Sequence, residues 1–155
     1  TTFNLGDDQK DKQYRSVISF NTLSIPDNAF ITSAELKIKR QGVVGTDPFN
    51  THGTVLVDIR NGAFGGSLSL QIVDFSASAS PGSIQEQISR LDTNWYSSVL
   101  DPANLMFINK YGQTQFKLFF SLDDNDDLGS DYVKFFSGNS TSANQPQLII
   151  TYYVP

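Results

Sequence analysis

The chain has 155 residues, 39% of them hydrophobic, and a formal net charge of −5, so it is long enough and apolar enough to bury the core of one domain. Its 11 Lys and Arg residues form no basic run, which argues against nucleic-acid binding and against attachment to an anionic membrane. The absence of cysteine excludes disulfides, thiol catalysis and zinc–thiolate sites, and no apolar run approaches the ~20 residues of a membrane-spanning helix.

Short segments in which apolar and polar residues alternate follow one another along the chain, separated by turns rich in Gly, Pro, Asn and Asp. Alternation with a period of two is typical of half-buried strands. The clearest segment is 31–40, in which Ala34, Leu36 and Ile38 share one face. We predict strands at residues 1–6, 14–20, 31–40, 54–60, 67–75, 95–100, 105–108 and 147–154, and two more within 113–137.

One segment has helical spacing instead. Ile84, Ile88 and Leu91 recur at intervals of three and four residues, and Ser83 is a plausible N-cap, so 83–91 is the one helix candidate. Strands that do not alternate with long helices favour an all-β fold, an antiparallel β-sandwich of jelly-roll-like form with at most one short helix. No linker or internal repeat divides residues 1–155, so we expect a single domain. Alternation predicts eight core residues: Leu36, Ile38, Val57, Phe116, Leu118, Phe120, Leu148 and Ile150.

An acidic cluster separates the two strands expected within 113–137. Like charges at this density repel one another, and a bound cation would relieve the repulsion. Oxygen-only ligands favour calcium. An EF-hand is excluded, because Leu128 and Lys134 stand where that loop needs Gly and Glu, but a loop of a sandwich could recruit further carboxylates from a neighbouring turn, such as Asp7 or Asp8. The predicted calcium ligands are Asp123, Asp124, Asn125, Asp126, Asp127 and Asp131, and the alternative is a solvated acidic turn.

Catalytic patterns are missing from the sequence. The single histidine, His52, precedes a strand and is expected in a loop, and no Gly-x-Ser-x-Gly elbow or Gly-rich phosphate loop occurs. Glutamates are scarce, so glycosidase chemistry would depend on aspartates that nothing marks as having a raised pKa. We therefore expect a protein that is not an enzyme.

Aromatic rings suggest a second kind of site, because a ring face can stack on a sugar. The candidates are Trp95, Tyr96 and Tyr111, with Tyr153 as a further one. Trp95 and Tyr96 are adjacent on a predicted strand, so only one of them can face outwards. The alternative places Trp95 in the core and Tyr96 at its rim.

Three segments resemble the DNRLRE-type domains, which are jelly-roll-like sandwiches of secreted bacterial and archaeal proteins and are similar to carbohydrate-binding modules. The matching segments are QYRSVISFNTLSIPDNAFITSAELKIKR (13–40), DYVKFFS (131–137) and QPQLIITYYVP (145–155). The resemblance implies a sandwich in an extracellular setting and no particular reaction. Domains of this type usually carry a further strand before the segment matching 1–6, so we expect the sheet edge at 1–6 to be bare or covered by another chain.

Two functions are consistent with these patterns. The first is a non-catalytic, calcium-stabilised structural or adhesive module of a cell surface or extracellular fibre, whose partners are neighbouring copies of itself or other surface proteins. The second is a carbohydrate-binding module that recognises a polysaccharide. The acidic composition and the abundance of Asn, Ser and Thr favour an extracellular location for both.

Overall fold

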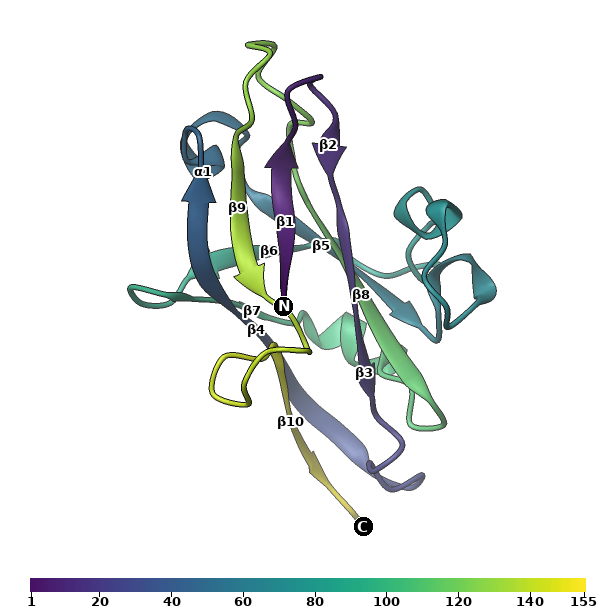
Figure 1. The fold of residues 1–155 in the computed structure, drawn as a ribbon. Coiled ribbons are helices and arrows are strands. Elements are labelled where there is room, and N and C mark those ends of the chain that lie inside the picture. Colours follow the sequence, from purple (N-terminus) through teal and green to yellow (C-terminus); the bar gives the residue numbers. More distant parts are fainter.

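The structure, a computed structural model, describes residues 1–155 and is predominantly antiparallel β (Figure 1). The turns that were expected from Gly, Pro, Asn and Asp separate ten strands. In chain order the strands are β1 (Thr2–Asp7), β2 (Gln13–Tyr14), β3 (Ser16–Asn21), β4 (Phe30–Val44), β5 (Val55–Asn61), β6 (Glu86–Arg90), β7 (Trp95–Val99), β8 (Gln113–Phe120), β9 (Tyr132–Phe136) and β10 (Gln147–Tyr153).

The strands form one curled sheet in the order β2-β1-β9-β4-β7-β6-β5-β8-β3, with β10 paired to β4. The two ends of this path, β2 and β3, are separated along the chain by Arg15 alone. The sheet therefore curls almost into a barrel, and the apolar faces of its strands enclose the core.

Strand β4 holds the curled sheet together. Its first part pairs with β10 on one side and with β7 on the other, and its last residues pair with β9. A register shift between Arg40 and Gly42 marks the point where the β9 pairing begins, and such irregularities bend a strand. The bend lets one strand belong to two differently directed parts of the sheet.

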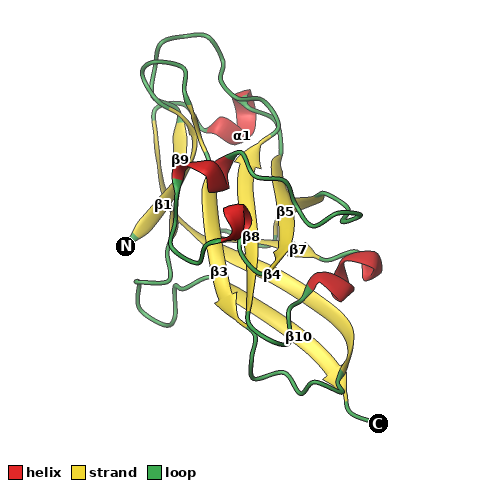
Figure 2. Cartoon of the chain, turned by 90° about the vertical axis from the view of Figure 1, so that its right-hand side faces the viewer, coloured by secondary structure: helices red, strands yellow, loops and turns green.

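The helical segments are short and lie outside the strands (Figure 2). They are α1 (Pro48–Thr51) and the 3-10 segments η1 (Phe64–Gly66), η2 (Ile72–Phe75) and η3 (Pro102–Phe107). None of them has the length and apolar character needed to span a bilayer.

Three element predictions are wrong. Residues 83–91 contain strand β6 instead of a helix, because β6 pairs with both β5 and β7 and supplies backbone partners that a helix could not. Residues 67–75 end in η2 rather than a strand, since Asp74 accepts the backbone N–H of Gln71 in a capping box. Residues 105–107 belong to η3, with Ile108 as its C-cap, and Asp101 caps the start of η3 by accepting the N–H of Ala103.

The predicted core is largely confirmed. Leu36, Ile38 and Val57 are fully buried, as are the three inward-facing residues of β8 that were predicted. Leu148 and Ile150 on β10 pack against this core but are only half-buried. The difference between β8 and β10 lies in their neighbours, because β8 has a strand on each side and β10 has one only.

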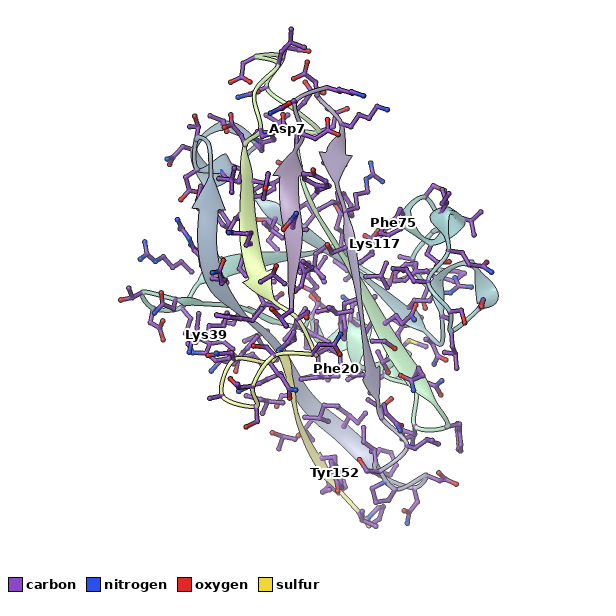
Figure 3. All side chains as sticks on the ribbon, in the orientation of Figure 1. Asp7, Phe20, Lys39, Phe75, Lys117 and Tyr152 are labelled. Atoms are coloured by element: carbon purple, nitrogen blue, oxygen red, sulfur yellow. The ribbon has the colours of Figure 1, made fainter.

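The other face of β8, which carries the polar residues Gln115 and Lys117, is buried too. The chain between β5 and β6 folds over this face as an excursion that contains η1 and η2 (Figure 3). Lys117 Nζ donates to the carbonyl of Ala77 at 2.6 Å, pairs with Asp58 at 3.2 Å and lies over the Phe64 ring. Burial by a segment that is distant in the sequence cannot be predicted from the alternation of apolar and polar residues in the strand.

Candidate metal site

Three connecting segments meet at one end of the sheet, shown at the top of Figure 1. They are the loop between β8 and β9 (121–131), the turn between β1 and β2 (8–12) and the segment after β4 that contains α1 (45–54). The acidic residues singled out from the sequence lie on the first two segments. Chain pairing at β1–β9 and β1–β2 brings the two together.

Asp7 and Asp131 form the buried base of this region. The N–H of Asp7 donates to the carbonyl of Asp131 at 3.0 Å, and the N–H of Asp131 donates to Asp7 Oδ1 at 3.0 Å. Gly6, at φ +131°, and Gly45, at φ +69°, pass so close to Asp131 that a Cβ at either position would overlap its atoms. The two glycines therefore allow the backbone to close around one aspartate.

His52 lies in the loop between α1 and β5, as expected, and is fully buried beside Asp7. Its Nε2 lies 3.2 Å from Asp7 Oδ2, although the alignment is not that of a hydrogen bond. Its Nδ1 is 2.7 Å from Thr51 Oγ1. The histidine thus joins the α1 segment to β1 in the interior.

Asn125 connects the exposed carboxylate of Asp127 to the buried carboxylate of Asp131. Its Nδ2 donates to Asp127 Oδ2 and to Asp131 Oδ2, each at 3.0 Å. Its own Oδ1 is buried and has no hydrogen-bond partner. The side-chain amide nitrogen of Asn125 therefore lies between the carboxylates of Asp127 and Asp131.

The remaining aspartates of the loop point elsewhere. Asp123 and Asp126 are exposed, and Asp124 accepts the N–H of Asp126 at 3.2 Å. Desolvation and the neighbouring carboxylates of Asp126 and Asp123 raise the pKa of Asp124 above its ordinary value of 3.8. The loop therefore carries unrelieved like-charge repulsion on its outer side.

Of the two aspartates expected from this side, Asp7 lies in the buried base below Asp131, whereas Asp8 stays within its own turn. Asp8 accepts the backbone N–H groups of Lys10 and Lys12 and so closes its own turn. Asp11 reaches across instead, since its Oδ1 accepts the N–H of Leu128 at 3.1 Å. Sequence spacing could not identify Asp11, because its position depends on its positive φ of 52°.

Two carboxylates and an amide around one point offer the kind of oxygen donors that calcium takes. The set falls short of a complete centre, since no group of three or more His, Asp or Glu side chains in the structure has the spacing of a metal site. Asn125 Oδ1 is buried and has no partner, and the same holds for Asp7 Oδ2 in the base. Asp127, Asp131 and Asn125 are the residues that would hold a cation, and they do not by themselves form a complete site.

The aromatic candidates are separated. Tyr96 is buried and stacks on Phe49 with ring centroids 4.8 Å apart, the reverse of the arrangement with Trp95 in the core and Tyr96 at the rim. Trp95 faces outwards and carries the ammonium groups of Lys37 and Lys39 over its ring at 5.3 and 5.5 Å. Tyr111 is 70% exposed in the turn before β8, and no ring contact joins it to Trp95.

Comparison with protein-family models gives no match for this chain. Comparison with curated proteins gives none either. The resemblance to the DNRLRE-type domains therefore stays a prediction.

Proposed function

We propose that this protein is a non-catalytic, calcium-stabilised structural or adhesive module of an extracellular assembly, built as a jelly-roll-like sandwich and related to the DNRLRE-type domains. The observation that carries the proposal is the arrangement of Asn125, Asp127 and Asp131 over the buried base of Asp7. The carboxylates of this loop are close together only in the folded protein. A cation bound between them would therefore stabilise the folded state.

Asp127 and Asp131 would hold the ion with carboxylate oxygens, and Asn125 would hold it with its carbonyl oxygen in place of the nitrogen that now faces them. Calcium supplies positive charge between the carboxylates when bound. The protein's own residues fix the site: Asp7 anchors the Asp131 backbone, and Asp11 anchors Leu128 on the opposite side of the loop.

The histidine supports a role without catalysis. His52 is fully buried and its ring packs near Phe120, with centroids 5.8 Å apart. A general base must come within hydrogen-bond reach of its substrate, and this ring has no exposed surface.

Thermal unfolding with and without calcium tests the proposal. At a calcium concentration of ~100 times Kd, the folded state gains about 2.7 kcal/mol, which raises Tm, and a chelator removes the gain. Asp127→Asn and Asp131→Asn abolish the response. The matched control is Asp123→Asn, an exposed aspartate of the same loop, which leaves most of the response in place.

An unchanged Tm in the presence of chelator contradicts calcium binding and returns the loop to a solvated acidic turn. A response that Asp123→Asn removes as fully as Asp127→Asn points to diffuse charge screening rather than a site. Isothermal titration of the same three variants separates these outcomes, because screening gives no saturable binding.

A carbohydrate-binding module is the second candidate. The observation in its favour is the Phe30–Tyr153 pair at the far end of the sheet, whose exposed rings are parallel within 14° with centroids 5.4 Å apart. The two rings stack on each other, so each offers one face at most. Saturable binding of an insoluble polysaccharide that is lost in Tyr153→Ala or Trp95→Ala would favour this candidate over the first.

A further inference from the structure

The curled sheet fails to close along one line. β2 pairs with β1 at Gly6 and Asp7, whereas β3 leaves this pairing after Arg15 and joins β8. No ladder of backbone hydrogen bonds joins β3 to β1 or to β10. We call the space with β3 on one side and β1 and β10 on the other the seam; in Figure 1 it runs downwards from the N-terminus.

The β1 wall of the seam presents unpaired backbone groups. Ser137 donates to the Thr1 carbonyl and Asp7 donates to the Asp131 carbonyl, so the odd-numbered residues of β1 bond to β9. Residues of an antiparallel strand bond alternately to its two sides. The N–H and C=O groups of Thr2 therefore face the seam. At Asn4 the carbonyl already accepts the Ser16 hydroxyl at 3.0 Å, so β3 lies directly beside β1 there and the seam ends.

The β3 wall does the same. Thr22 donates to the carbonyl of Gly112, so the even-numbered residues of β3 bond to β8. The N–H and C=O groups of Val17 and Ser19 consequently point into the seam. Both residues border a groove of about 350 Å³ at this place.

On β10 the alternation has the same outcome. Leu100 donates to the Ala34 carbonyl, which assigns the even-numbered residues of β4 to β7 and the odd-numbered ones to β10. The partners Ile149 and Glu35 are thus a bonded pair, and the backbone groups of Leu148 and Ile150 face away from β4 towards the seam.

Side chains repeat the pattern. Ten apolar residues pack against the core while only half-buried, and five of them belong to the three strands beside the seam: Phe3, Ile18, Phe20, Leu148 and Ile150. Phe3 and Phe20 line the groove, and Figure 3 shows Phe20 between β3 and the loop that precedes β10. Inward-facing residues on strands with two neighbours, such as Leu36 and Leu118, are fully buried instead.

We propose that the seam binds an extended segment of a neighbouring protein molecule, which enters as an added strand between β3 and the β1/β10 wall. Backbone donors and acceptors at strand spacing on both walls match an extended polypeptide, which satisfies them in a way that a sugar or an apolar small molecule does not. This deepens the proposed function and rests on it for the identity of the neighbour, a further component of the same assembly.

The topology fixes the direction and pattern of the added strand. β3 and β10 run parallel to each other and opposite to β1, as the successive antiparallel pairings require. A strand antiparallel to both β3 and β10 forms the better ladder with two of its three neighbours. Its alternate side chains must be apolar, because every second one meets Phe3, Phe20 and the half-buried residues of β10.

Amide hydrogen exchange with a probe peptide tests the inference on the whole chain. The probe is an acetylated and amidated eight-residue peptide that alternates Thr with Val, and its matched control carries Pro at two central positions, which removes N–H donors. At ten times Kd the probe slows exchange of the Thr2, Ser19 and Ile150 amides about tenfold. The control peptide leaves these amides unchanged, and neither peptide affects the amide of Leu118.

Ser19→Pro removes an N–H that faces the seam without removing a β3–β8 bond, so it lowers probe affinity while Ser19→Thr does not. If Ser19→Pro fails to fold, the exchange pattern of the unaltered protein still decides. Slow exchange at Thr2, Ser19 and Ile150 in the free protein overturns the inference, because it means that the seam is already closed. Unchanged exchange at millimolar probe, or protection elsewhere, overturns it as well. The calcium titration is independent of these amides, so each proposal can fail without the other.

Discussion

The middle of the sheet and the seam are built from the same kind of strand and differ in their lateral neighbours. On β8, which lies between β5 and β3, the inward-facing Phe116, Leu118 and Phe120 are fully buried. On β3, at the end of the path, the inward-facing Ile18 and Phe20 are half-buried. Alternation therefore assigns the face of a side chain, whereas the depth of its burial depends on whether a strand lies on each side.

The largest expected effect on the free energy of unfolding comes from truncating a phenylalanine in the middle of the sheet, and we compare it with one at the seam. Phe120→Ala lowers the free energy of unfolding by about 3–5 kcal/mol, because a fully buried ring is lost. Phe20→Ala lowers it by about 1–2 kcal/mol, since only part of its surface is removed from water. Urea denaturation of both variants measures the two losses. Equal losses would mean that the seam is as well packed as the middle of the sheet.

The second prediction concerns the outer face of β8. Lys117→Met lowers the free energy of unfolding by about 3 kcal/mol, because it leaves the largely buried Asp58 carboxylate without its cation and the Ala77 carbonyl without its donor. The control is Lys37→Met on β4, where no carboxylate is paired, and its effect stays within about 0.5 kcal/mol. A small loss at Lys117 would show that the η1–η2 excursion does not cover this face in solution.

The smallest effect tests the repulsion in the acidic loop. The raised pKa of Asp124 means that its ionised form is disfavoured in the folded state, so the penalty is absent below its ordinary pKa of 3.8 and appears as pH rises through the raised value. Asp124→Asn is therefore slightly more stable than the unaltered protein at pH 7 without calcium, and the gain disappears at pH 3. Thermal unfolding at the two pH values shows the change. A gain that persists in acid would have another cause than charge.

Sequence patterns predict those parts of this fold that local alternation determines. The strands 31–40 and 54–60 and most of the core follow from period-two spacing, and β4 and β5 confirm them. The segment 83–91 could not be assigned in this way, because Ile84, Ile88 and Leu91 fit a helix by spacing and become β6 through the partners on both sides.

The candidate site was predictable in its location and not in its composition. The aspartate-rich loop is visible in the sequence, and the structure places it over a buried base as a compact feature. The selection of Asp127, Asp131 and Asn125 from six candidates depends on backbone turns, including a positive φ at Asp126 and Leu128. Such turns arise from packing between the loop and the β1–β2 hairpin, which no local pattern records.

The position of β4 also has a consequence for how the chain folds. Its residue Leu36 pairs with Leu148 of β10, and Val43 pairs with Val133 of β9. On this side, the partners of β4 lie about a hundred residues further along the chain. Pairings between such distant segments require large loops to close first, and folding dominated by them is slow. During synthesis, β4 leaves the ribosome long before β9 and β10 exist. β4 can therefore pair with β7 on one side first, and its other side is paired only when β9 and then β10 have been made.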